Sequence, residues 1–165
     1  MQRAYIGIGA NLGEPLSTVQ AAVRALARLP RSTFVAASRP WRSISAGAPG
    51  PDYVNAAAAI DTELAPLALL DALLAIESLH GRERSTRNAP RTLDLDLLLH
   101  GRTQCADDRL TLPHPRLQQR KFVLGPLLEL APDLDLPGIG LASIAWQAVS
   151  AQDAFPIPSS RELTP

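Results

Sequence analysis

The sequence is poor in cysteine, lysine and histidine, and two of these shortages exclude a class of site. Cys105 is the only cysteine among 165 residues, so an internal disulfide and a cysteine-based zinc site are both excluded. The three histidines, His80, His100 and His114, do not have zinc-ligand spacing. Lys121 is the only lysine, so arginine supplies nearly all of the positive charge. Where the arginines cluster is therefore more informative than their number.

The chain also lacks an excess of either charge, a long apolar run and many aromatic residues. Its 16 basic residues balance 16 acidic ones, and aromatic residues make up 4% of it. Nucleic-acid-binding proteins usually carry a basic excess, so we expect no nucleic-acid partner. No run of about 18 apolar residues predicts a membrane span. The first residues do not have the pattern of a signal peptide, so we expect a cytoplasmic protein.

Apolar residues make up 46% of the chain, and its length suits a single domain, residues 1–165, with a substantial core. Hydrophobic periodicity predicts strands at 4–9, 32–38, 52–62, 92–100 and 109–112, and helices at 15–29, 66–79, 122–130 and 141–149. The first six elements form a split βαβ pattern. This pattern predicts an α+β fold: a ferredoxin-like sandwich with a mainly antiparallel sheet and helices packed on one face. The segment from about residue 152 contains three prolines, and we expect an extended tail there.

Two aspartates, Asp94 and Asp96, alternate with leucines in the predicted strand at 92–100. The alternation puts both carboxylates on one face, with Cα atoms about 6–7 Å apart. Such a pair suits Mg²⁺, which prefers oxygen ligands and keeps several water or phosphate oxygens. The alternative is an exposed strand face that happens to carry two aspartates. The apolar run through Leu98 and Leu99 predicts a central strand, where two like charges are costly without a cation.

The segment directly before this strand is strongly basic. Residues 81–91 carry four arginines, at 82, 84, 87 and 91, against Glu83, which gives 4 − 1 = +3. Arginine binds phosphate oxygens through two parallel hydrogen bonds. A basic loop that leads into a carboxylate pair indicates a polyphosphate site beside a metal. The alternative is a solvated charged loop. The chain has no GxxxxGK[ST] motif, so it is not a P-loop protein.

Two further polar groups accompany predicted strands. Tyr53 and Asn55 alternate on one face, and an aromatic ring with an amide can hold a flat heterocycle. Taken alone, Tyr53 is more simply a packed residue. Arg109 and Thr111 also share a face, and His114 follows, where it can contact a phosphate or ribose; a structural histidine is the alternative. Glycines 7, 9 and 13 do not match GxGxxG, and we interpret them as turn and packing glycines.

Together these segments resemble the 6-hydroxymethyl-7,8-dihydropterin pyrophosphokinase family of the folate pathway. The resemblance covers roughly residues 4–150 and rests on AYIGIGANLG at 4–13, PDYVNAA at 51–57, PRTLDLDLLL at 90–99 and LTLPHPR at 110–116. It implies transfer of pyrophosphate from ATP to the hydroxymethyl group of the pterin, with release of AMP. One departure is the run Asn88-Ala89-Pro90-Arg91, where many members have an aromatic residue before Gly-Pro-Arg.

The resemblance also implies a role for each residue of the site. Two Mg²⁺ ions bridging the triphosphate would be bound by Asp94 and Asp96. Catalysis would be assisted by Arg82 and Arg91. The nucleotide would be held by Glu77, Arg84, Arg87, Arg109, Thr111, His114 and Arg120. The pterin would be held by Ser43, Ala46, Tyr53, Asn55 and Phe122, with the two aromatic rings on either side of it.

Two other functions compete with this interpretation. A ferredoxin-like nucleic-acid-binding module would need exposed aromatics in a basic setting, which the composition disfavours. A regulatory ATP-binding domain without catalysis would be indicated by loss of Asp94 or Asp96, and both are present. We therefore expect an enzyme that acts as a monomer on two small-molecule substrates, ATP and hydroxymethyldihydropterin.

Overall fold

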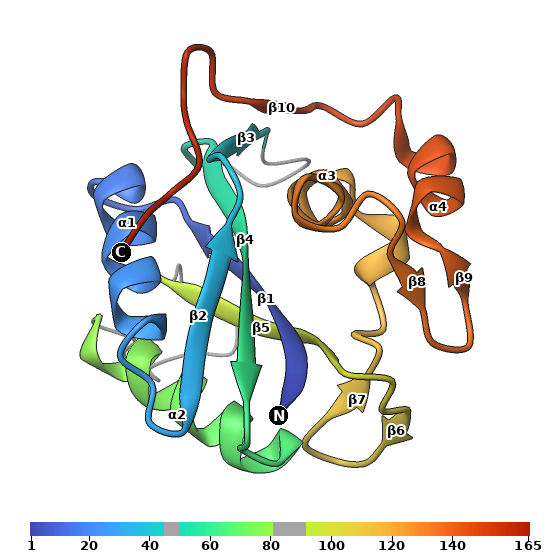
Figure 1. The fold of residues 1–165 in the computed structure, drawn as a ribbon. Helices are drawn as coiled ribbons and strands as arrows, with labels where there is room; N and C mark the ends of the chain where they lie inside the picture. The colour runs from blue at the N-terminus through green and yellow to red at the C-terminus, as the bar shows by residue number, and fades with distance from the viewer. Residues whose placement is uncertain (45–49, 81–91) are drawn as a thin grey trace.

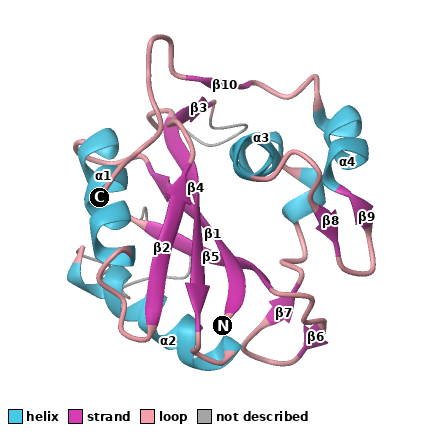
Figure 2. Cartoon of the chain, in the orientation of Figure 1, coloured by secondary structure: helices cyan, strands magenta, loops and turns pink. Residues whose placement is uncertain are grey.

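A six-stranded sheet lies between two layers of helices (Figures 1 and 2). The computed structural model describes residues 1–44, 50–80 and 92–165. The helices are α1 (Pro15–Leu26), α2 (Pro66–Leu79), α3 (Lys121–Leu130) and α4 (Ala142–Val149), with a 3-10 turn, η1, at Leu117–Gln119. The longer strands are β1 (Gln2–Ala10), β2 (Ser32–Ala37), β4 (Tyr53–Thr62) and β5 (Asp94–His100). The shorter strands are β3 (Trp41–Ser43), β6 (Cys105–Ala106), β7 (Thr111–Leu112), β8 (Asp135–Leu136), β9 (Gly140–Leu141) and β10 (Ala154–Pro156).

The main sheet has the order β10-β3-β4-β1-β5, and β2 pairs with β4 beside β3. Every pairing in it is antiparallel. Two separate hairpins, β6-β7 and β8-β9, complete the strands of the described residues. The α+β class and the mainly antiparallel sheet are therefore confirmed. In the part of the chain that the structure describes, no helix is long and apolar enough to cross a membrane.

Side-chain alternation along the central strands builds a core on each face of the sheet. In β4, Ala58 and Ile60 face the core formed with α1 and α2, whereas Ala57 and Ala59 face the core formed with α3 and α4. We call the core with α1 and α2 the first core and the core with α3 and α4 the second core. In β1, Ile6 belongs to the first core and Tyr5 to the second. The expectation that helices cover only one face is wrong, because the C-terminal helices cover the other. The small alanines of β4 let helices approach both faces closely.

Strand β5 is the edge strand of the sheet, which corrects the expectation that it is central. Its apolar run has a different cause, since both of its faces are covered. Leu95 and Leu97 belong to the first core, and Leu98 and Leu99 belong to the second. The N–H of His114 also donates to the carbonyl of Leu98 at 2.9 Å, so a following segment covers part of the free edge.

The C-terminal segment is part of the fold, although the sequence predicted an extended tail. Strand β10 pairs with β3, and beyond it the N–H of Ile157 donates to the carbonyl of Pro40 at 3.0 Å. Further on, the N–H of Leu163 donates to the carbonyl of Ser38 at 3.1 Å. The side chain of Leu163 is 8% exposed and belongs to the first core. The chain ends beside α1 (Figure 1).

Helix α3 is fixed against the sheet by a close contact and a partly buried carboxylate. A Cβ atom at Gly125 would lie 2.4 Å from the ring of Trp41, so only glycine permits this approach. One turn on, the Glu129 carboxylate accepts hydrogen bonds from Trp41 Nε1 at 2.9 Å and from Arg39 N at 2.9 Å. These contacts set the position of the α3 residues that face the sheet.

The docking of the C-terminal segment predicts a stability effect. Leu163→Ala should lower the free energy of unfolding by about 2 kcal/mol, since it removes a buried side chain from the first core. The control is Leu79→Ala, because Leu79 is 85% exposed and should change the value by less than about 0.5 kcal/mol. Chemical denaturation followed by circular dichroism measures both. Equal stability of the two variants would contradict the packing of this segment.

Candidate active site

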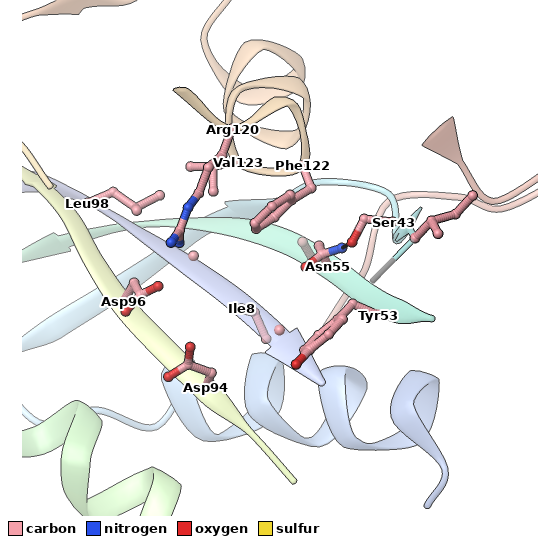
Figure 3. Close-up of a pocket in the computed structure, with 14 residues that line it drawn as sticks. Ile8, Ser43, Tyr53, Asn55, Asp94, Asp96, Leu98, Arg120, Phe122 and Val123 are labelled. Carbon is pink, nitrogen blue, oxygen red and sulfur yellow. Dashed lines mark hydrogen bonds between the residues drawn. The ribbon is translucent and has the colours of Figure 1, made fainter. Parts of the chain in front are cut away.

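A cavity of about 400 Å³ opens between the sheet and the first turn of α3 (Figure 3). It is lined by residues from four strands and from α3: Gly7, Ile8, Gly9, Ser43, Tyr53, Asn55, Ala56, Asp94, Asp96, Leu98, Arg120, Phe122 and Val123, with Ile44 beside β3. The structure thus brings together residues that are far apart in the sequence. Both predicted metal ligands and four of the five predicted pterin-binding residues are among them.

Two glycines of β1 form the floor of this cavity. The antiparallel register places Gly9 between Asn55 of β4 and Asp94 of β5, and Gly7 next to Asp96 of β5. Because neither glycine has a side chain, the floor between the amide and the carboxylates stays open. Gly7 is also a packing glycine, as predicted, since a Cβ atom there would lie 3.4 Å from the Leu98 side chain, but the sequence did not predict the cavity floor. The spacing of two between these glycines within a predicted strand was the sequence signal that they share one face.

The aromatic residues and the buried amide stand at one end of the cavity. Tyr53 comes from β4 and Phe122 from α3, and both side chains project into the cavity (Figure 3). Asn55 is buried between them, and its Nδ2 donates to Ser43 Oγ at 2.8 Å. The guanidinium carbon of Arg120 lies 5.6 Å from the centroid of the Phe122 ring, a cation–π contact. This end can hold a flat, hydrogen-bonding heterocycle.

The two aspartates stand at the other end, on the same face of β5 (Figure 3). His114 Nε2 lies 3.9 Å from Asp96 Oδ1. Burial lowers the pKa of His114, and the positive charges of Arg120 and Arg116 lower it further, while Asp94 opposes them. The Nδ1 atom accepts the N–H of Arg116 at 3.3 Å, so neutral His114 carries its proton on Nε2 and turns it toward Asp96.

The donor set at this end fits magnesium. Among residues 1–44, 50–80 and 92–165, no group of three or more His, Cys, Asp or Glu side chains could hold a metal ion. A closed protein cage of the structural zinc type is therefore not formed by these residues. Mg²⁺ is instead commonly bound by one or two carboxylates together with water and phosphate oxygens. Asp94 and Asp96 supply this pair, beside a cavity that has room for the remaining ligands.

A second cavity, of about 300 Å³, adjoins the first at Asp96, which lines both. Three residues predicted to bind the nucleotide line it: Arg109, Thr111 and His114. The Asp107 carboxylate orders the approach to β7 by accepting the N–H groups of Arg109 at 2.8 Å and Leu110 at 2.9 Å, and these bonds lower the pKa of Asp107. Arg109 also forms an ion pair with Asp71 of α2.

Two predicted nucleotide-binding residues have other positions. Arg120 lines the first cavity, beside Phe122, rather than the second. Glu77 of α2 lines neither cavity and is buried, and its Oε1 accepts the N–H of Leu95 at 2.7 Å. Leu95 lies between Asp94 and Asp96, so Glu77 holds the strand segment that carries both carboxylates. Sequence reasoning did not predict this contact.

Five predicted site residues lie outside the described residues: Ala46, Arg82, Arg84, Arg87 and Arg91. The basic character of residues 81–91 is a property of the sequence alone. Their assigned roles stay predictions.

Comparison with known proteins gives the family. A family profile described as 7,8-dihydro-6-hydroxymethylpterin-pyrophosphokinase matches residues 5–132. The 2-amino-4-hydroxy-6-hydroxymethyldihydropteridine pyrophosphokinase of Pseudomonas aeruginosa is 52% identical over 138 residues, which cover 83% of this chain and 85% of that protein. The chain belongs to this pyrophosphokinase family. The resemblance inferred from the motifs is thus confirmed.

Further relatives carry the same name. The pyrophosphokinase of Haemophilus influenzae is 46% identical over 138 residues, covering 83% of this chain and 86% of that protein. That of Synechocystis sp. is 40% identical over 161 residues, covering 97% of this chain and 83% of that protein. Neither the family match nor these relatives support a nucleic-acid-binding or purely regulatory module.

Solved structures similar to this pyrophosphokinase family member share its fold. One, described as HPPK-DHPS in complex with substrates, has a TM-score of 0.70 at 10% identity and covers 90% of this chain. Another, Plasmodium falciparum HPPK-DHPS wild type with pteroate, has a TM-score of 0.71 at 10% identity and covers 89%. The chain spans 45% and 42% of those two chains. At this identity the likeness concerns the fold alone.

The position of Glu77 predicts that it stabilises the edge strand. Glu77→Ala should lower the free energy of unfolding by about 1–3 kcal/mol, because the buried N–H of Leu95 loses its acceptor. Glu77→Gln keeps a carbonyl acceptor and should lose less. Denaturant titration compares both with Glu14→Ala, whose carboxylate makes no capping bond at α1. A Gln variant as unstable as the Ala variant would rule out the main-chain bond as the cause.

Proposed function

We propose that this protein transfers pyrophosphate from ATP to the hydroxymethyl group of 6-hydroxymethyl-7,8-dihydropterin, giving the pterin diphosphate and AMP in folate biosynthesis. Membership of the pyrophosphokinase family supports this reaction. The structural observation that supports this reaction most directly is that the two cavities share a wall. Asp96 lines both, so a heterocycle in the first and a nucleotide in the second would meet beside the carboxylate pair.

The first cavity has the chemistry of a pterin site. Its rings, Tyr53 and Phe122, can lie against the two faces of a bicyclic heterocycle, since offset aromatic stacking is favourable. The buried Asn55 amide offers hydrogen bonds to the ring edge, and its bond to Ser43 fixes the amide plane. Backbone groups near Ser43 and Ala46 would complete the site.

The second cavity has the chemistry of a nucleotide site. Arg109, Thr111 and His114 would bind the nucleotide there. Arg120, from the first cavity, would reach the phosphates beside Asp96, and Arg84 and Arg87 would bind them from the basic segment. Glu77 would act on the nucleotide through β5, because it holds the strand between the two aspartates.

Magnesium is the metal that this donor set fits, and Asp94 and Asp96 would hold two ions with the ATP. When bound, Mg²⁺ neutralises charge on the triphosphate and orients the β-phosphorus. The protein residues then align the reactants. The hydroxymethyl oxygen of the pterin loses its proton and forms a bond to the β-phosphorus, the bond from the β-phosphorus to the α–β bridging oxygen breaks, and AMP leaves with that oxygen. Alignment and charge neutralisation supply most of such an acceleration.

Two arginines of the basic segment, Arg82 and Arg91, would assist this step by neutralising charge on the transferring group. We assign no general base to the hydroxymethyl proton.

The finer description of the fold belongs to the same proposal. A ferredoxin-like sandwich is supported by the strand order β5-β1-β4-β2, with α1 and α2 in the crossovers. We also propose that residues 1–165 form a single domain and act as a cytoplasmic monomer.

The product of the nucleotide tests the reaction class. Incubation with ATP, Mg²⁺ and reduced hydroxymethylpterin should release one AMP for each pterin consumed, measured by anion-exchange chromatography. Chelation of Mg²⁺ with excess EDTA should stop the release. Formation of ADP in place of AMP would mean transfer of a single phosphate and would overturn the proposal.

The position of the carboxylate pair predicts that its removal lowers turnover but leaves pterin binding nearly unchanged. Asp96→Asn and Asp94→Asn should each lower kcat by about a hundredfold or more, because the metal ligands lose charge. Pterin affinity, measured by calorimetry without ATP, should change by less than about threefold, since the aromatic end is intact. Asp133→Asn is the control, because Asp133 is exposed and outside both cavities. Turnover of either site variant at the control rate would remove these aspartates from the metal site.

A further inference from the structure

The only lysine of the chain is buried, and its two neighbours in the sequence belong to the cavity wall. Lys121 is the first residue of α3, 8% exposed, and lies between Arg120 and Phe122. Its two neighbours line the first cavity, whereas Lys121 does not. A buried ammonium group is costly unless its hydrogen-bonding capacity is satisfied. Its contacts therefore indicate what the fold gains from it.

The Lys121 ammonium binds the segment that follows α4. Its Nζ donates to the carbonyl of Ser150 at 2.9 Å and to that of Gln152 at 3.2 Å. It also lies 5.5 Å from the ring centroid of Trp146 and 5.0 Å from that of Phe155, both cation–π contacts. Ser150 caps the C-terminus of α4, where a positive charge is favourable. One side chain thus ties α4 and β10 to the start of α3.

The side chain of Gln152 extends this connection along the backbone before Phe122. Its Oε1 accepts the N–H of Lys121 at 2.9 Å, and its Nε2 donates to the carbonyl of Gln119 at 2.9 Å. Arg120 lies between these two bonded residues. The backbone on both sides of Arg120 is therefore fixed by the C-terminal segment rather than by α3 alone.

The same segment also holds the opposite wall. In β10, Ala154 pairs with Ser43 of β3, and just before it the carbonyl of Asp153 accepts the N–H of Ile44 at 3.2 Å. Ser43 Oγ in turn accepts the hydrogen bond of Asn55. Figure 1 shows β10 running from the α4 side of the molecule to the β3 side. Residues 150–156 therefore connect the Phe122 wall with the Ser43 wall.

We propose that Lys121 is a positioning residue, which, through residues 150–156, sets the separation of the Phe122 and Ser43 walls and hence the affinity for the pterin. This inference rests on the proposed function of the first cavity. A ligand that stacks on a ring and also bonds to an amide requires both groups to be held in place within a fraction of an ångström. Contacts with neighbouring residues must hold them there. The nucleotide cavity is built from α2, β5, β7 and adjoining residues. Of the residues proposed to bind the nucleotide, only Arg120 adjoins this connection, so ATP affinity should change less than pterin affinity.

The test is Lys121→Met, which keeps the length of the side chain and removes the donors. We expect the Kd for reduced hydroxymethylpterin, measured by calorimetry without ATP, to rise about tenfold or more. The KM for the pterin should rise in parallel, while kcat at saturating pterin and the Kd for ATP stay within about threefold. Lys121→Arg keeps the charge and the donors and should restore at least half of the lost binding free energy.

The matched control for a general loss of stability is Leu163→Ala. Leu163 packs in the core on the other face of the sheet, so its loss should lower the melting temperature without changing the pterin Kd. If Lys121→Met does not fold, Gln152→Ala removes the two side-chain bonds around Arg120 and should raise the pterin Kd about threefold or more.

Three results would overturn the inference. One is a pterin Kd within twofold of the wild-type value for Lys121→Met, or for Gln152→Ala where that variant replaces it. The second is an equal rise in Kd for Leu163→Ala, which would make the effect one of stability alone. The third is a wild-type protein that binds no pterin, which would overturn the proposed function together with this inference.

Discussion

The antiparallel register of β1 between β4 and β5 is the constraint on which the site depends. It sets Asn55, Gly9 and Asp94 in one row across the sheet, and places Gly7 next to Asp96 in the adjoining row. A shift of β5 by one residue would turn the two carboxylates into the core with α1 and α2, and the same shift of β1 would put isoleucine side chains where Gly7 and Gly9 lie. Burial of Ile6 and Ile8 in that core therefore fixes the position of the polar residues on the opposite face.

A sheet covered on both faces explains how an edge strand can carry the two aspartates. β5 is buried by leucines on both faces, and its free edge receives the Glu77 carboxylate and the N–H of His114. An edge strand of this kind is held rigidly without a second strand partner. Its outer edge borders the second cavity, so Asp96 can face two cavities. A central strand would have a neighbour where the nucleotide cavity lies.

The site is completed by elements from the second half of the chain. Helix α3 brings Phe122 and Arg120 over the sheet, and its distance is fixed by Gly125 against Trp41 and by the Glu129 carboxylate. Residues beyond α4 then hold the first turn of α3 through the single lysine. The walls of the cavity are thus positioned by contacts between residues that are 29 to 88 positions apart in the sequence.

The sequence by itself determined the four helices, the longer strands and the family, whereas most of the short strands were not predicted. Alternation in LDLDL, proline at the start of α1 and α2, and the PRTLDLDLLL, PDYVNAA and LTLPHPR motifs are local patterns, and local propensity and motif spacing are sufficient to interpret them. The α+β class and the pyrophosphokinase family followed from these patterns.

Only the tertiary structure decided the order of the strands and the burial of each face. It placed β5 at the edge, put α3 and α4 on the second face, made Gly7 and Gly9 a cavity floor, and docked the C-terminal segment. It also showed that Glu77 and Lys121 form hydrogen bonds with main-chain atoms, which no sequence motif indicates. The physical reason is that strand pairing and packing join distant segments, whereas an apolar run in the sequence has the same appearance in a central strand and in a covered edge strand.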